Sequence, residues 1–173
     1  MTEFYAGGGA LRPHVIALCH KLQIAYAFDF PGWVSFERLP RALLGVDILV
    51  NPSLRDWSET FCIANIEAMA LGIPLVTFAV GGVGQYVEAP QTRSSASPDS
   101  YPSFEMGGNA VVISRPHPLA VRDAVEFLVG HPVEGAALAQ RGVARVQRHF
   151  SLAEQMRRYR DFYLAASARP TAE

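Results

Sequence analysis

The sequence predicts an α/β fold in which a parallel sheet carries helices on both faces. Short, wholly apolar runs such as Pro74–Ala79 alternate with longer segments such as Phe61–Leu71, in which apolar residues recur at helical spacing. Glycine or proline turns separate the two kinds of segment. Strands that are buried on both faces read as continuous apolar runs, and they are typical of parallel sheets covered by helices.

The first fifty residues are expected to form three strands and two helices. The first strand ends at Gly7-Gly8-Gly9 and the second at Pro31-Gly32. Apolar residues from Leu11 to Leu22 share one face of the first helix, and Glu37 favours the start of the second. The expected elements are a strand over Phe4–Ala6, a helix over Ala10–Gln23, a strand over Ile24–Phe30, a helix over Phe36–Leu44 and a strand over Val46–Val50.

The remaining elements continue the alternation and end in helices. Gly72 is a natural end for the helix that follows the third strand. Ser151 is a good N-cap with Glu154 three residues later, so a capping box is expected at the last helix. The expected elements are helices over Phe61–Leu71, Pro118–Val129, Glu134–His149 and Leu152–Ala166, and strands over Pro74–Ala79 and Ala110–Ile113. We expect the five strands to form one sheet of a single domain over residues 1–173.

Two features interrupt this regular pattern. The segment Ala89–Met106 is rich in serine and proline and is predicted to be a flexible surface insertion. The first strand lies so close to the start of the chain that nothing precedes it. An α/β sheet with such a bare edge suggests that a strand–helix unit is missing upstream, so we expect the domain to be partial.

Composition excludes several classes of function. The net charge is −1 and no basic stripe is present, which argues against nucleic-acid binding. No apolar run reaches the roughly 18 residues of a membrane span, and the N-terminus is not a signal peptide, so a cytoplasmic protein is expected. Cys19 and Cys62 lie in apolar runs without metal-ligand spacing and are predicted to be buried thiols. We expect neither a metal nor a cofactor.

The candidate site is a pair of carboxylates, Glu59 and Glu67. On one helix, eight residues amount to two turns plus about 80° and about 12 Å of rise, so both would point roughly the same way. Between them lie the free N–H groups of the first turn, around Thr60, Phe61 and Cys62. Such a helix N-terminus is a ready site for a phosphate group.

An ordinary amphipathic helix with two solvated glutamates is the simpler alternative, and spacing alone favours it. Three neighbouring features weaken it. Glu67 lies inside an apolar run, where an unpaired charge is costly. The helix follows a strand end, where α/β folds place ligands. A second glycine turn, Gly81-Gly82, follows the next strand.

The order of groups, a carboxylate, a row of amide donors and another carboxylate, fits a nucleotide sugar. The carboxylates would accept hydrogen bonds from hydroxyl groups, and the amides would bind a diphosphate between them.

At this point the chain resembles a known family. Glu59-x7-Glu67, then Ala68-Met69-Ala70-x-Gly72-x-Pro74, and then Gly81-Gly82 look like the Glu-x7-Glu block of glycosyltransferase family 4. The turn Gly7–Arg12 resembles the Gly-x-Gly-Pro-Leu-Arg turn of that family. The resemblance covers most of the chain outside Ala89–Met106. It implies the C-terminal, donor-binding half of a GT-B fold, which is a Rossmann-like domain, without its first strand–helix unit.

The resemblance implies a role for each site residue. Glu59 would contact the transferred sugar and stabilise positive charge at its anomeric carbon, and Glu67 would bind the ribose hydroxyls. The remaining donor-binding residues are Phe61, Cys62 and Ile63 through their amides, Trp33 and Val34 at the base, and Gly81 and Gly82 beside the sugar. The reaction implied is metal-free transfer of a sugar, with retention, from a UDP- or GDP-linked donor to an acceptor hydroxyl.

Three interpretations stay open. The chain is the donor half of a glycosyltransferase that acts only when joined to an N-terminal GT-B domain. Alternatively, it is a truncated, non-catalytic domain that at most binds a nucleotide sugar or serves as an interaction module. The diphosphate-neutralising Arg and Lys of the family would lie on the missing unit, which favours weak binding and no transfer by the chain alone. A sugar-nucleotide epimerase of the same fold is the third, and the Glu-x7-Glu block argues against it.

Overall fold

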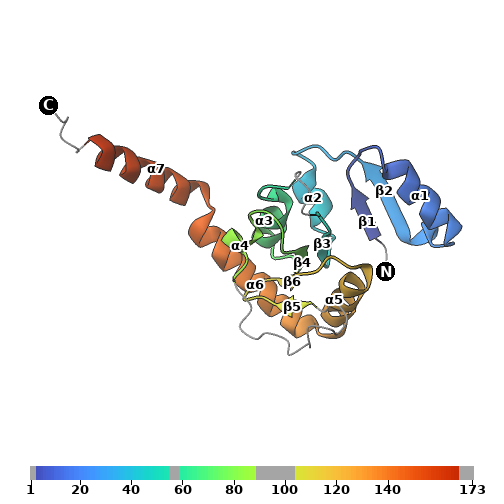
Figure 1. Cartoon of the computed structure of the whole chain (residues 1–173). Coiled ribbons are helices and arrows are strands. Elements are labelled where there is room, and N and C mark those ends of the chain that lie inside the picture. Colours follow the sequence, from blue (N-terminus) through green and yellow to red (C-terminus); the bar gives the residue numbers. More distant parts are fainter. Residues whose placement is uncertain (1–2, 55–58, 89–103, 168–173) are drawn as a thin grey trace. The chain divides into compact units, whose positions relative to one another are not determined.

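The computed structural model describes residues 3–54, 59–88 and 104–167 of the chain (Figure 1). Two compact units are present, Met1–Val46 and Asp47–Glu173. The predicted alternation of strands and helices is confirmed in both. The strands pair as a two-stranded sheet in the first unit and a four-stranded sheet in the second.

The first unit holds a parallel pair of strands and two helices. Strand β1 (Glu3–Ala6) pairs with β2 (Phe28–Gly32), helix α1 (Arg12–Lys21) connects them, and α2 (Leu39–Leu43) follows. A short 3₁₀ helix at Ala25–Ala27 takes the place of the first half of the predicted second strand.

Strand β2 also runs on through the Pro31-Gly32 turn that was expected to end it. Among the described residues β2 pairs on one side only, and a strand with a free side tolerates proline because no N–H is needed there.

The second unit is built on a four-stranded sheet in the order β3-β4-β6-β5. Strands β3 (Leu49–Asn51), β4 (Leu75–Phe78) and β6 (Val111–Ile113) are parallel, whereas β5 (Glu105–Met106) is antiparallel to β6. Every residue of β4 and β6 is buried, as expected of strands covered on both faces. The predicted insertion Ala89–Met106 therefore ends in a strand, while residues 89–103 lie outside the described part.

Three helices cover this sheet: α3 (Ile63–Ala70), α5 (Pro118–Gly130) and α6 (Pro132–His149). Helix α6 buries one stripe of residues at helical spacing, and α3 packs against it. A Cβ at Gly142 would lie only 3.3 Å from Met69 Cγ, so glycine allows the two helices this close approach. The buried residues of α6 are Gly135, Leu138, Ala139, Gly142 and Val146.

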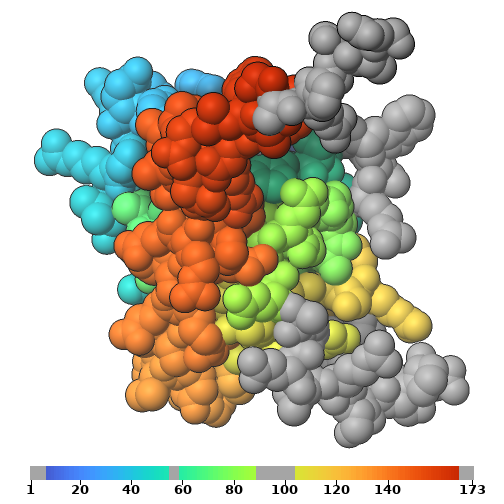
Figure 2. Space-filling view, turned by 90° about the vertical axis from the view of Figure 1, so that its left-hand side faces the viewer, coloured from blue at the N-terminus to red at the C-terminus, as the bar shows by residue number. Residues whose placement is uncertain are grey.

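A short helix that the sequence did not predict, α4 (Val83–Tyr86), follows the Gly81-Gly82 turn. It lies beside α6 (Figure 2). Arg145 of α6 donates to the Gln85 carbonyl at 3.1 Å, and its guanidinium lies 3.8 Å from the Glu88 carboxylate. The contacts of Arg145 connect the segment after β4 to α6.

The last helix, α7 (Leu152–Ser167), has no buried residue. The Ser151 hydroxyl accepts the Glu154 N–H at 3.3 Å, as the predicted capping box requires. The Glu154 carboxylate binds Arg157 and Arg158, so the reciprocal half of the predicted box is not seen. Within the described ranges, no helix has the length and apolar character that crossing a membrane demands.

Candidate functional site

The site lies where the loops after β3 and β4 meet the start of α3. The carboxyl ends of adjacent parallel strands lie at the same edge of a sheet, which is the usual ligand position in α/β folds. A pocket of about 480 Å³ opens there. Its lining consists of Asn51, Ser53, Glu59, Thr60, Phe61, Cys62, Ile63 and Ala64.

Glu59 is not part of the helix, which corrects the two-turn geometry expected from the sequence. Helix α3 begins at Ile63, two residues later than predicted. The place of Glu59 is fixed instead by two hydrogen bonds. Its Oε1 accepts the Cys62 N–H at 2.6 Å, and its Oε2 accepts the Ser53 hydroxyl at 3.3 Å. The carboxylate therefore lies at the N-terminus of α3.

Cys62 is the N-cap of α3 and has a left-handed backbone, with φ of 53°. A residue with a Cβ seldom adopts this conformation, and it persists where surrounding contacts impose it. The Asn51 side-chain amide donates to Cys62 Sγ, and the side chain is buried.

The Cys62 thiol is held in its neutral form. Burial raises its pKa, and the Glu59 charge raises it further, while a hydrogen bond from the Asn65 backbone partly offsets both. The predicted burial of Cys62 is confirmed, as is that of Cys19.

Two backbone donors at the start of α3 belong to residues that line the pocket. The N–H groups of the first two helical residues, Ile63 and Ala64, have no intrahelical acceptor. No other hydrogen bond from either amide is found in the part of the chain that the structure describes. Together with the helix dipole they favour an anion. The Cys62 N–H, also expected to be free, is already bound to Glu59.

Gly81 and Gly82 hold the Glu59 loop by close backbone contact. The Gly82 N–H donates to the Thr60 carbonyl at 2.7 Å. A Cβ at Gly81, where φ is 53°, would collide with the Glu59 carbonyl, and one at Gly82 would lie 2.8 Å from the Thr60 carbonyl. Both glycines are thus required by the chain itself, and their predicted approach to a sugar stays a prediction.

Glu67 lies one turn further along α3. Four residues separate it from Ile63, so the two share a face of the helix with about 6 Å of rise between them. Its side chain is partly exposed and does not line the Glu59 pocket. The two glutamates were expected to point roughly the same way from one helix, but they are placed by different elements, and Glu67 does not line the pocket that Glu59 lines.

Trp33 and Val34 lie in the first unit, and their expected contact with the base stays a prediction. Trp33 is 83% exposed, which leaves its ring available to a ligand.

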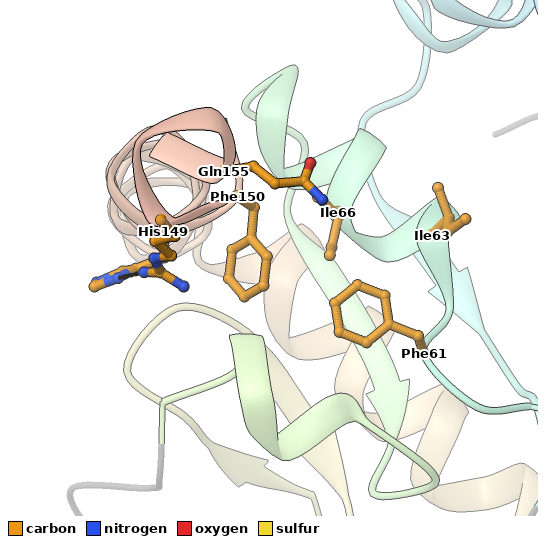
Figure 3. Close-up of a pocket in the computed structure, with 7 residues that line it drawn as sticks. Phe61, Ile63, Ile66, His149, Phe150 and Gln155 are labelled. Atoms are coloured by element: carbon orange, nitrogen blue, oxygen red, sulfur yellow. Dashed lines mark hydrogen bonds between the residues drawn. The ribbon is translucent and has the colours of Figure 1, made fainter. Parts of the chain in front are cut away.

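The Phe61 side chain is part of an aromatic cluster and not of the predicted contact with a donor. Its ring lies 5.5 Å from that of Tyr86 and 6.0 Å from that of Phe150. Phe61, Ile66 and Phe150 turn toward one another around a second, apolar pocket of about 470 Å³ (Figure 3). Only the Phe61 backbone is therefore placed for the predicted contact with a donor.

A buried polar network behind the pocket was not predicted. Asn65, Thr77 and Tyr86 are each at most 1% exposed, and Asn65 hydrogen-bonds to both of the others. Burial raises the pKa of Tyr86, so its hydroxyl stays protonated. The available signal was Asn65 itself, a polar residue inside the apolar run of α3, which is the feature that singled out Glu67.

Comparison with known proteins gives a consistent family. Residues 4–117 match the family described as "Glycosyl transferases group 1". The uncharacterized glycosyltransferase MJ1607 of Methanocaldococcus jannaschii is 34% identical over 83 residues, which are 48% of this chain and 20% of that protein. The 2-deoxystreptamine N-acetyl-D-glucosaminyltransferase of Streptomyces fradiae is 29% identical over 149 residues, or 85% of this chain and 33% of that protein.

The fold has relatives among solved structures. Alr3699/HepE of Anabaena, in complex with UDP, matches with a TM-score of 0.75 and 16% sequence identity, over 95% of this chain and 41% of that one. The chain thus spans a third or less of the length of the two curated relatives and less than half of the length of the Anabaena chain.

Proposed function

This chain belongs to the group 1 glycosyl transferases and has the fold of a C-terminal GT-B domain, and we propose that its Glu59 pocket binds the sugar and diphosphate of a nucleoside-diphosphate sugar. One observation carries the proposal. The Glu59 carboxylate lies in the same pocket as Ile63 and Ala64, whose helix N-terminal amides have no partner among the described residues. The amides of Ile63 and Ala64 would donate to diphosphate oxygens, and Glu59 would accept hydrogen bonds from sugar hydroxyls.

Ligand binding would change the partner of the Cys62 amide. When a sugar hydroxyl donates to Glu59, the carboxylate can turn from Cys62, and the freed N–H becomes a third donor to the diphosphate. Such an exchange replaces one charge-assisted hydrogen bond by another, so its cost is small compared with leaving either group unpaired.

Glu67, four positions after Ile63 on α3, would accept the two ribose hydroxyls. UDP is the first nucleotide to test, because the Anabaena neighbour was solved with it. The proposed reaction is transfer of the sugar to an acceptor hydroxyl with retention of configuration, in which Glu59 stabilises positive charge at the anomeric carbon.

Electrostatics supports weak binding by the chain alone. Among the described residues, none that lines the Glu59 pocket is basic, and the pocket itself contains a carboxylate. A diphosphate leaving group needs cations close to its oxygens. We therefore propose that transfer requires an N-terminal GT-B half that supplies the acceptor site, together with basic groups for the diphosphate, and that the 173-residue chain binds without transferring.

The same observation favours a second candidate, a domain that binds a nucleotide sugar without ever catalysing transfer. Joining the chain to the N-terminal half of a related enzyme separates the two. Sugar transfer that disappears in Glu59→Ala supports the transferase, whereas binding without transfer in every such fusion supports the second candidate.

Titration calorimetry of the chain with UDP, UDP-linked and GDP-linked sugars tests the binding proposal. Glu67→Ala should abolish measurable heat, whereas Glu134→Ala removes an exposed helical carboxylate far along the chain and should leave the heat unchanged. Absence of heat with every nucleotide, or equal heat with Glu67→Ala, would reject the proposal.

A further inference from the structure

We propose that Asn65, which is fully buried and does not line the Glu59 pocket, is the positioning residue that sets the geometry of the donor site through Asn51. The proposal rests on the proposed function, because the site that it positions is the proposed donor pocket.

Asn65 uses every hydrogen-bonding group of its side chain except one lone pair. Its Oδ1 accepts from Asn51 Nδ2 at 2.8 Å. Its two Nδ2 hydrogens go to Thr77 Oγ1 at 3.1 Å and to Tyr86 Oη at 2.9 Å. These partners belong to β4 and α4, while Asn51 ends β3. One side chain thus connects the start of α3 with three other elements.

The direction of these bonds leaves one orientation for each amide. Asn51 Oδ1 accepts the Ser53 N–H at 3.0 Å, so its Nδ2 must face Asn65. Asn65 must then present its carbonyl to Asn51 and its amino group to the two hydroxyl oxygens. A side-chain amide has donors on one end and an acceptor on the other, so reversing either one would oppose two acceptors or two donors.

Asn51 passes this constraint to Glu59. Its second Nδ2 hydrogen goes to Cys62 Sγ, and its Oδ1 holds the Ser53 backbone. Among the described residues, Cys62 and Ser53 donate to the Glu59 carboxylate. Both donors of the proposed sugar-binding carboxylate are therefore held by Asn51, and Asn51 is oriented by Asn65. The hydrogen bond from Asn51 to Cys62 Sγ also supports the left-handed backbone of Cys62.

Thr77 provides a matched pair of variants that separates positioning from packing. Its side chain is 1% exposed and its hydroxyl accepts from Asn65. Thr77→Val keeps the shape but removes the acceptor, which leaves an Asn65 N–H unpaired. Thr77→Ser keeps the acceptor but removes a buried methyl group. Both changes lower stability, by an unsatisfied donor in the first and a small cavity in the second.

Calorimetry with UDP-glucose, which carries the sugar that Glu59 would bind, tests the proposal beside the thermal unfolding temperature of each variant. Positioning predicts that Thr77→Val weakens UDP-glucose binding about fivefold, because Asn65 then no longer fixes Asn51 and the Glu59 carboxylate, and that Thr77→Ser binds as the wild type does. Equal UDP-glucose affinity of folded Thr77→Val and wild type, or equal weakening by Thr77→Ser, would overturn it.

Amide NMR spectra recorded without ligand test the positioning role of Asn65 independently of the proposed function. The Ser53 and Cys62 resonances should shift in Thr77→Val and stay in place in Thr77→Ser. Tyr86→Phe removes the other acceptor of Asn65 and serves if Thr77→Val fails to fold. Absence of UDP-glucose binding by the wild type rejects the proposed function alone. Unmoved Ser53 and Cys62 resonances in Thr77→Val and Tyr86→Phe reject the positioning role.

Discussion

The Glu59 carboxylate accepts the Cys62 N–H at 2.6 Å and so occupies one of the amides that the Glu-x7-Glu block assigns to a ligand. The acid of the proposed site and one of its backbone donors therefore pair with each other. The bond also fixes the approach of the chain to α3, because Cys62 is the N-cap of that helix. Glu59 therefore has a structural role in addition to its proposed role toward the sugar.

Replacing Glu59 by alanine should lower the free energy of unfolding. The loss of a charge-assisted hydrogen bond at a partly exposed helix start is expected to cost about 1–2 kcal/mol. Glu59→Gln keeps an oxygen acceptor for the Cys62 N–H and should cost less. Urea unfolding of both variants measures the difference, and wild-type stability of Glu59→Ala would contradict the capping role.

Gly81→Ala should be strongly destabilising and Gly84→Ala should not. At Gly81 the backbone is left-handed and a Cβ would collide with the Glu59 carbonyl, so roughly 2 kcal/mol or more is expected from strain and displacement. At Gly84, inside α4, no atom lies within 4 Å of the added Cβ. Comparing the denaturation midpoints checks this, and similar values for the two variants would show that the contact with Glu59 is unimportant.

Sequence reasoning predicted the elements well where burial alone decides them. The run Leu75–Phe78 is buried on both faces and could only be a central strand, and it was predicted to within one residue at each end. Sequence reasoning failed where a local turn has the same apolar character as a strand. The 3₁₀ turn at Ala25–Ala27 looks as apolar as the strand that follows it, so periodicity could not separate the two.

The candidate site was predicted in part. The Glu-x7-Glu spacing and the glycine turn identified the loops that meet at the pocket, because each of these motifs follows the end of a predicted strand in the sequence. The start of α3 could not be predicted, since the left-handed N-cap is a cysteine and not a glycine. The network around Asn65 joins residues up to 35 apart in sequence, from Asn51 to Tyr86, and no local pattern encodes such contacts.

Cys62 should react slowly with iodoacetamide in the folded protein. Burial raises the pKa of its thiol, and alkylation requires the thiolate. In a Cys19→Ser background, which leaves one cysteine, modification at pH 8 should be many times slower in buffer than in denaturant. Mass spectrometry of timed samples gives both rates, and equal rates would contradict the buried environment.

Glu154 should remain ionised to unusually low pH. Hydrogen bonds from Arg157 and then Arg158 lower its pKa to about 2. A carboxyl whose folded pKa is depressed stabilises the helix above its unfolded value of about 4.3, and the contribution is lost as the pH falls through about 2. Carbon-detected NMR titration should show this midpoint in the wild type and one near the unfolded value in Arg157→Gln/Arg158→Gln. A wild-type midpoint near 4 would disprove the pairing.

The central claim is that a nucleotide sugar binds between Glu59 and the N-terminal amides of α3. Amide NMR of the labelled chain during titration with UDP-glucose tests it most directly. The largest shifts are predicted at Cys62, Ile63 and Ala64, with Cys62 changing as its N–H leaves Glu59. Saturable shifts confined to other parts of the molecule, such as the apolar pocket around Phe150, would contradict the claim.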